Sequence, residues 1–269
     1  MKQTEFHHNK NLCTFIICMG GNSDAHCVFK SVHPGLEPLC HRQRQRGILD
    51  EPDRGRYGAV SAGLVGPKRN DPDTSAGAAI REANSGYYDF YLALHSNAIG
   101  NGSAQTSARG IIAFYYPGSA GGQRGAELIA KNLREIYPLP DKVTTRPTTA
   151  LGEVSRSRFP AVLVEIGYHD NYSDALWLES HVEDVAQQLV KALTEYFGLP
   201  FIPPMDLKRG KVRLSYGTLN LRSTPSPAGT VIANLPNGAE VTVYGEWNGW
   251  YVVQYGDQVG YAAAAYIDV

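Results

Sequence analysis

The chain has 269 residues, of which 43% are hydrophobic and 19% are charged, so it is long enough and apolar enough to form one core and a smaller second domain. Its formal net charge of −1 at pH 7 gives no reason to expect a nucleic-acid partner or electrostatic attachment to a membrane. No apolar run approaches the roughly 18 residues of a membrane span, and the apolar stretch at residues 12–19 is too short to predict a secretion signal.

Residues 1–68 show neither helical nor strand periodicity. All the cysteines and most of the histidines lie in this segment: Cys13, Cys18, Cys27, Cys40, His7, His8, His26, His33 and His41. Such enrichment can indicate a zinc module, but no H-x₃₋₅-H pair accompanies these cysteines. We therefore expect no metal module here.

A displaced reading frame would explain this unusual opening. Read one nucleotide later, with permitted third bases, the codons of residues 24–64 can spell a start codon, a strand-like TVYLSP and an amphipathic helix EYWMNRIADAMVPYLR. The present frame would resume near residues 65–68. Freedom at the third positions is the competing explanation. We interpret residues 1–68 as an atypical, frame-shifted segment.

From residue 69 onward, predicted helices and strands alternate. Apolar spacing and capping residues predict helices at about residues 74–84, 126–137 and 180–197. Ser180-x-x-Glu183 forms a capping box for the last of these helices. Apolar and aromatic runs predict buried strands at residues 89–95, 110–116 and 161–167. The alternation predicts an α/β domain at residues 69–197, with a mostly parallel sheet flanked by helices.

The last third of the chain has a different pattern. Residues 198–209 contain three prolines and are typical of a linker. Beyond them, turn signals such as Pro236-Asn237-Gly238 and Asn248-Gly249 separate short strands. Residues 210–269 are therefore predicted to form a small all-β barrel or roll.

Two ionisable residues lie in the predicted buried strands. His95 ends the run DFYLALH, and Glu165 lies within AVLVEIG. Open α/β sheets place their sites at the carboxyl ends of strands, and a carboxylate in an apolar strand is costly to bury unless it is partnered or protonated. Glu165 is therefore a candidate general base or acid. On this reasoning alone, His95 could be a metal ligand or a hydrogen-bonded core histidine.

The segments around these two residues resemble zinc-type N-acetylmuramoyl-L-alanine amidases, which cleave peptidoglycan. LALHSNA at residues 92–98 is similar to the S-I-H-A-N-A strand end of that family, and FPAVLVEIGYHDN at residues 159–171 is similar to its P-A-V-L-V-E-x-G-F-x-S-N stretch. The resemblance implies that His95 binds zinc. It also implies that Glu165 is the catalytic base, acting on water that the zinc activates.

The resemblance makes three further residues candidates for substrate binding, namely Asn97, Arg158 and His169. His169 could instead be a substitute zinc ligand or an ordinary loop histidine. The family's D-P-G-H-G-G motif and the glutamate ligand that follows it are not visible in residues 1–68. Because catalytic zinc is normally held by three protein ligands, we expect the chain as written to be poorly active or inactive.

Residues 210–269 resemble bacterial SH3 domains. LNLRSTPS at residues 219–226 is similar to their L-N-V-R-S-G-P-S signature, and VIANLPNGAEVTV and NGWYVV continue the match. The resemblance implies a module that binds cell-wall peptides. Most of its aromatic residues are expected to pack in the barrel, and one or two to line a shallow groove: Trp247, Trp250, Tyr251 and Tyr261.

With the resemblance, the sequence predicts a hydrolase that cuts the amide between N-acetylmuramic acid and L-alanine, with zinc as its cofactor and a barrel that tethers it to peptidoglycan. The resemblance alone places it at the cell wall or outside the cell. One alternative is a non-catalytic cell-wall-binding protein with a degenerate amidase domain, which zinc content would distinguish. Another is a different metallopeptidase on a similar sheet, which product analysis would distinguish.

Overall fold

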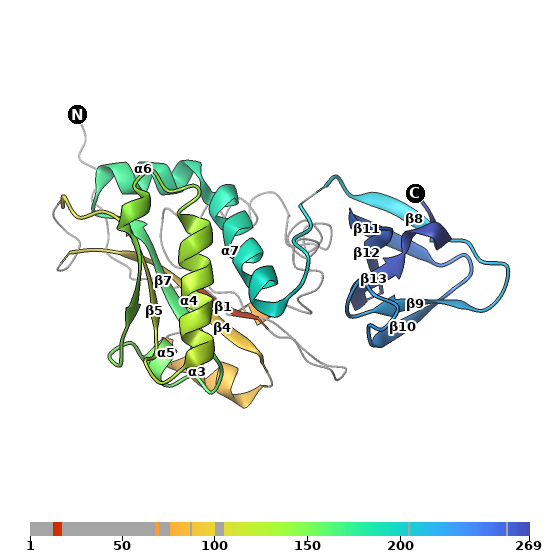
Figure 1. Ribbon diagram of the computed structural model, residues 1–269, viewed down its shortest axis with the longest axis horizontal. Helices are drawn as coiled ribbons and strands as arrows, with labels where there is room; N and C mark the ends of the chain where they lie inside the picture. The colour runs from red at the N-terminus through yellow and green to blue at the C-terminus, as the bar shows by residue number, and fades with distance from the viewer. Residues whose placement is uncertain are drawn as a thin grey trace.

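The computed structural model describes residues 13–17, 68–69, 76–86, 88–99, 105–203, 205–256 and 258–269, the first two ranges by their backbone alone. Two sheets account for the strands in these ranges (Figure 1). One has six strands in the order β3-β1-β4-β7-β5-β6, and the other has seven in the order β10-β9-β13-β12-β11-β8-β14. None of the helices in the described residues has both the length and the apolar character that crossing a membrane requires.

The six-stranded sheet is mixed, where a mostly parallel sheet was predicted. Its strands are β1 (Cys13–Ile17), β3 (Lys68–Arg69), β4 (Phe90–Asn97), β5 (Ile111–Tyr115), β6 (Val143–Pro147) and β7 (Ala161–Tyr168). Strand β4 runs parallel to β7, and β5 runs parallel to β6, but β5 and β7 are antiparallel. The described residues 105–110 ahead of β5 contain no helix, and a parallel return normally needs a crossover helix. Strand β5 therefore runs opposite to β4.

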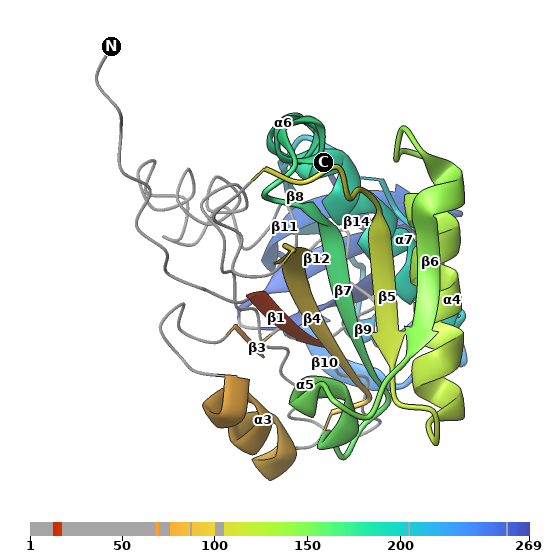
Figure 2. The ribbon, with the colours of Figure 1, turned by 90° about the vertical axis from the view of Figure 1, so that its left-hand side faces the viewer.

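Helices cover both faces of this sheet, which confirms the predicted α/β class. They are α3 (Ala76–Ser85), α4 (Ala120–Leu133), α5 (Gly152–Ser155), α6 (Tyr172–Ser180) and α7 (Val182–Phe197), with a 3₁₀ turn at Pro140–Lys142. Helices α4 and α7 pack against each other, as do α3 and α5. Figure 2 shows α6 at one end of the sheet and α3 and α5 at the other. The short strands β1 and β3 lie in a segment for which no element was predicted.

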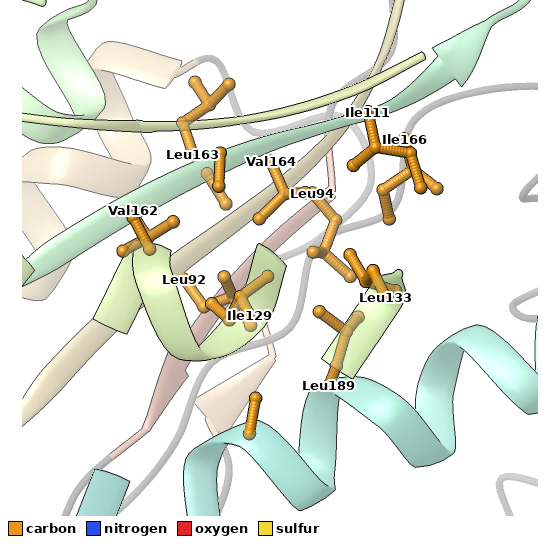
Figure 3. Close-up of a cluster of buried hydrophobic side chains, with 14 of the residues drawn as sticks. Leu92, Leu94, Ile111, Ile129, Leu133, Val162, Leu163, Val164, Ile166 and Leu189 are labelled. Carbon is orange, nitrogen blue, oxygen red and sulfur yellow. The ribbon is translucent and has the colours of Figure 1, made fainter. Parts of the chain in front are cut away.

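The alternation of side chains along β4 determines what each face of the sheet carries. The ring of Phe90 packs on Tyr196 of α7 at 4.8 Å between centroids, whereas the hydroxyl of Tyr91 reaches α5. Successive residues of a strand point to opposite faces, so the even-numbered residues of β4 face α4 and α7. Figure 3 shows the resulting core, formed by Leu92, Leu94, Ile111, Ile129, Leu133, Val162, Val164, Ile166 and Leu189. The odd-numbered residues, including His95, face the α3–α5 side.

Helix α4 approaches the sheet closely at Gly125. A Cβ atom there would lie 2.5 Å from Cζ of Phe90 and 3.3 Å from Cγ2 of Val162. The Phe90 ring is fully buried against α7 and cannot move aside. We therefore expect Gly125→Val to lower the free energy of unfolding by about 1–3 kcal/mol, the usual cost of overpacking a core.

Urea unfolding of the full chain, followed by far-UV circular dichroism, measures this loss. The matched control is Gln123→Val at an exposed position of the same helix. A Gly125→Val chain no less stable than this control would show that α4 can withdraw from the sheet at no cost.

Two predicted helix starts differ from those observed. Helix α4 begins at Ala120, earlier than expected, because the Ser119 side chain accepts a hydrogen bond from the backbone N–H of Gly122. The predicted capping box at Ser180 is wrong, since Ser180 ends α6 and its hydroxyl donates to the carbonyl of Leu176 at 2.9 Å. Serine often bonds back to the preceding turn in this way. Helix α7 then begins at Val182 without a side-chain cap.

The seven-stranded sheet confirms the predicted all-β domain. Its strands are β8 (Lys208–Val212), β9 (Thr218–Arg222), β10 (Val231–Pro236), β11 (Glu240–Trp247), β12 (Trp250–Tyr255), β13 (Gln258–Ala263) and β14 (Ile267–Asp268), with a 3₁₀ turn at Ala264–Tyr266. All its recorded pairings are antiparallel. Asn248 and Gly249 join β11 to β12 with φ of 46° and 78°, the positive values that a tight hairpin turn with Asn-Gly requires.

The segment between the domains is anchored on both sides. Leu199 packs against the core of the α/β domain. Ile202 is 3% exposed and packs with Tyr244, Val252 and Tyr261 of the barrel. The predicted linker at residues 198–209 therefore contributes side chains to both hydrophobic cores.

Candidate active site

His95 and Glu165 are direct neighbours on adjacent strands. They are register partners in the parallel pair β4–β7, and the register shifts immediately after them. Paired residues of neighbouring strands point to the same face, so both side chains lie on the side of the sheet that α3 and α5 cover. A shift of register, such as a bulge, commonly re-aims side chains next to a site.

A third ionisable residue, Glu153 of α5, meets this pair. Its side chain is 4% exposed, and its Oε2 lies 3.0 Å from Nε2 of His95. The hydroxyl of Tyr91 donates a hydrogen bond to the other carboxylate oxygen, Oε1, at 2.9 Å. Sequence analysis did not single out Glu153. The available signal was a glutamate between Leu151 and Val154, in a short segment without periodicity.

The three side chains line one cavity of about 380 Å³. Strands β4 and β7 supply its floor, and α3 and α5 supply its sides: the lining includes His95, Leu163, Glu165, Ala76, Gly77, Ile80, Leu151 and Glu153. The exposed Arg156 also contributes to the lining. The cavity therefore lies over the face of the sheet and gathers an imidazole and two carboxylates.

The environment of Glu165 favours a carboxyl group that can exchange a proton. Burial raises the pKa of Glu165 above its ordinary value, the charge of His95 lowers it, and the charge of Glu153 raises it further. The Oε2 atom of Glu165 is buried and has no hydrogen-bond partner among the described residues. A general base needs a free oxygen of this kind to receive a proton.

Two of the candidate substrate-binding residues, Asn97 and His169, lie close together where the two strands that carry His95 and Glu165 end. Asn97 accepts a hydrogen bond at its Oδ1 from the backbone N–H of Ala98, and its carbonyl accepts one from the N–H of His169. The ring Nδ1 of His169 lies 3.1 Å from the hydroxyl of Ser96. Asn97 and His169 thus join the ends of β4 and β7, but neither lines the cavity.

Arg158, the third candidate substrate-binding residue, contacts helix α3. Its backbone N–H donates to Oδ1 of Asn84 at 2.9 Å, and its guanidinium donates to the carbonyl of Asn84 at 2.6 Å. Arg158 does not line the cavity, whereas Arg156 does. The structure therefore joins Arg158 to α3 and places a different arginine at the candidate site.

Asp174 fixes the backbone beside the strand ends. It is 1% exposed and accepts hydrogen bonds from Nε of Arg109 at 2.7 Å and from the hydroxyl of Tyr137 at 2.6 Å. The backbone N–H groups of Gly110 and Tyr168 also donate to Asp174 at 3.1 Å. One carboxylate thus ties the start of β5 to the end of β7.

The described side chains fit a zinc ion in part. Nε2 of His95 lies against Oε2 of Glu153, and Oε2 of Glu165 is a buried atom without a hydrogen-bond partner in the described ranges. Imidazole and carboxylate groups are common zinc ligands. No group of three or more histidine, cysteine, aspartate or glutamate side chains in the described part of the chain has the spacing of a metal site. The described residues therefore account for only part of a zinc ligand set.

Comparison with known protein families identifies both domains. Residues 65–195 match the family model for N-acetylmuramoyl-L-alanine amidase, and residues 217–268 match that for the bacterial SH3 domain. Residues 65–195 therefore resemble the N-acetylmuramoyl-L-alanine amidase family, and residues 217–268 resemble bacterial SH3 domains.

Several solved structures are similar in fold. The CwlD amidase from Clostridioides difficile, in complex with the GerS lipoprotein, is 17% identical with a TM-score of 0.41, over 45% of this chain and 61% of that one. The match therefore spans less than two thirds of that protein. An N-acetylmuramoyl-L-alanine amidase from Clostridium difficile 630 is 14% identical with a TM-score of 0.46, over 66% of this chain and 91% of that one. AmiC2 of Nostoc punctiforme is 17% identical with a TM-score of 0.44, over 53% and 79%. No curated protein sequence matches the chain.

Proposed function

We propose that the chain is a zinc-dependent hydrolase that cuts the amide between N-acetylmuramic acid and L-alanine in peptidoglycan. One observation carries the proposal: His95 and Glu165 are register partners on adjacent strands and line the same cavity. The match of residues 65–195 to the amidase family model supports the choice of the bond that is cut. His95 is the proposed zinc ligand, and Glu165 is the proposed base.

The proposed roles of the zinc ion and of Glu165 follow from their chemical properties. A bound zinc ion polarises the amide carbonyl and makes water a stronger acid. Glu165 takes the proton of the attacking water at its unpartnered Oε2 and delivers it to the amide nitrogen that leaves. A carboxyl group whose pKa is raised, as for Glu165, accepts that proton more readily at neutral pH than an ordinary one does.

The barrel is the proposed anchor on the polymer and places the protein at the cell wall. It carries a hollow of about 510 Å³ lined by polar and aromatic residues, including Arg213, Tyr216, Asn220, Arg222, Trp250 and Tyr266. Tyr216 is 90% exposed, and Tyr261 is buried in the barrel core. Exposed aromatic and polar side chains around a shallow hollow suit a peptide ligand. Anchoring raises the local concentration of the cleavable bond without altering the cavity.

Metal content and product analysis test the proposal together. The full chain should bind zinc, and incubation with purified peptidoglycan should release L-alanine amino termini, which a chelator should suppress. A chain that binds peptidoglycan but neither binds zinc nor cleaves the amide bond would be a non-catalytic wall-binding protein. Release of other amino termini would identify a different peptidase.

We also expect the chain as written to turn over slowly, because residues 1–65 do not provide the remaining zinc ligands by any motif. Replacing them with the displaced-frame translation should raise the rate of release of L-alanine amino termini and the zinc content. Sequencing of the gene across codons 20–70 shows whether that translation is encoded. If it is not, His26, His33 and His41 become the candidate ligands. These histidines and the displaced-frame boundary lie outside the residues whose side chains the structure describes.

A further inference from the structure

We propose that the hollow on the barrel binds the free carboxyl end of a wall peptide, and that Arg222 recognises the carboxylate. The inference rests on the proposed role of the barrel as an anchor, and it names the part of the polymer that the anchor holds. A peptide that is not cross-linked through its carboxyl group has such an end, whereas a cross-link converts that group to an amide. The barrel would therefore select open wall peptides.

Strand β9 presents a row of polar side chains to the hollow. Thr218, Asn220 and Arg222 alternate along β9 with two buried leucines, Leu219 and Leu221. Successive residues of a strand point to opposite faces, so the three polar side chains share the face turned away from the barrel core. All three line the hollow. The row therefore offers a hydroxyl, then an amide, then a guanidinium group.

Arg222 is a half-buried cation at the end of this row. It is the last residue of β9. Its Nη1 donates a hydrogen bond to the carbonyl of Gly229 at 2.7 Å, which uses one of the five N–H groups of the guanidinium. Among the described residues, no aspartate or glutamate forms an ion pair with Arg222. A partly desolvated charge of this kind is stabilised by an anion that enters the hollow.

The charge of the hollow also favours a carboxylate. Of the described residues that line it, two are arginines, Arg213 and Arg222, and none is acidic. Arg213 pairs through its Nε with Asp268, which lies outside the lining, and both side chains of this pair are exposed. Arg222 is therefore the cation that is left for a ligand. A guanidinium group can bind a carboxylate through two parallel hydrogen bonds.

The position of the cation suits the end of a peptide better than its middle. The main chain of a peptide carries a charge only at its ends, and every open end has one α-carboxylate, whatever the side chains are. A peptide lying along β9 would place its amide groups beside the hydroxyl and amide of the row and its last carboxylate beside Arg222. Three aromatic residues line the same hollow and can pack on the peptide side chains: Tyr216, Trp250 and Tyr266.

Binding of the full-length chain to purified cell-wall sacculi tests this inference. Sedimentation is compared for untreated sacculi and for sacculi whose free carboxyl groups have been converted to amides with carbodiimide and ammonia. A chelator is present throughout, so that cleavage does not change the polymer. We expect amidation to weaken binding by at least about tenfold, the smallest effect of losing hydrogen bonds to a charged group. Equal binding to both preparations overturns this inference alone. Absence of binding to untreated sacculi overturns the anchoring role and this inference with it.

Small competitors identify which anion is recognised. N-acetyl-alanyl-alanine with a free carboxyl end should displace the chain from untreated sacculi, and the same dipeptide with a terminal amide should not. The α-amide of N-acetylaspartic acid carries its carboxylate on a side chain, and inorganic phosphate represents an anionic wall polymer. Displacement by either of these at the same concentration as the free-ended dipeptide would overturn recognition of a peptide end.

Substitutions in the barrel test the role of Arg222. We expect Arg222→Gln to abolish the preference for untreated over amidated sacculi, a loss of at least about tenfold. Arg209→Gln is the matched control, because Arg209 is exposed on β8 outside the hollow and the change in charge is the same. A preference that survives Arg222→Gln assigns the carboxylate to another residue. If Arg222→Gln fails to fold, Tyr216→Ala takes its place: Tyr216 is 90% exposed, and unchanged binding by that chain would show that the hollow is not the binding site.

Discussion

Replacing Asp174 with alanine lowers the free energy of unfolding of the α/β domain by about 3–5 kcal/mol, the cost of breaking a buried ion pair by removing one partner. Asp174 is 1% exposed and holds Nε of Arg109 at 2.7 Å. Its loss also leaves the hydroxyl of Tyr137 and the backbone N–H groups of Gly110 and Tyr168 without their acceptor.

Urea unfolding of the full chain, followed by far-UV circular dichroism, gives this free energy. Asp184→Ala is the matched control, since Asp184 is exposed on α7. We expect the control to lie within about 0.5 kcal/mol of the unchanged chain. A loss below about 1 kcal/mol for Asp174→Ala would mean that the strand ends hold together without this carboxylate.

Replacing Glu165 with glutamine reduces the release of L-alanine amino termini by about 10²–10⁴-fold, the usual contribution of a positioned general base. The amide keeps the size of the side chain but cannot accept the proton of water. Zinc binding should change little, because the proposed ligand His95 remains. The loss should therefore appear in kcat and not in metal content.

The pH dependence of the reaction gives a second readout for Glu165. The base acts in its ionised form, so the rate should fall as the pH drops through the pKa of Glu165. Burial raises that pKa above the ordinary 4.5, and the fall should therefore begin at a higher pH than for an ordinary glutamate. A rate that follows the same pH profile in the Glu165→Gln chain would assign the titrating group to another residue.

The elements predicted best from the sequence are those with a regular pattern of apolar residues, either a continuous run or a stripe at helical spacing. Strand β7 is a continuous apolar run covered on both faces, and α7 has an apolar stripe from Val182 to Phe197, so both were predicted close to their observed bounds. The direction of β5 is not encoded in such a pattern, since an apolar strand has the same sequence whichever way it runs. Strand β6, with a largely exposed VTTRP sequence, has no apolar run to indicate it.

In the candidate site, too, the residues within a clear apolar pattern were predicted and the residue outside such a pattern was missed. His95 and Glu165 were found because each is an ionisable residue in an otherwise apolar strand. Glu153 was missed because α5 has only four residues, too few to show helical periodicity. Its contacts are with Tyr91 and His95, which are distant in sequence and meet it only in the folded domain. Asn97, Arg158 and His169 followed from the resemblance, and whether they bind substrate stays a prediction.

The packing of Leu199 and Ile202 limits how far the anchored protein can act. Leu199 belongs to one core and Ile202 to the other, so only Pro200 and Phe201 separate two fixed points of the chain. Three extended residue steps cover at most about 11 Å. While both side chains stay packed, the α/β domain stays within a short distance of the barrel. If the barrel binds a wall peptide as proposed, the cavity would then reach only the amide bonds next to that peptide, and cleavage of further bonds would require the barrel to rebind.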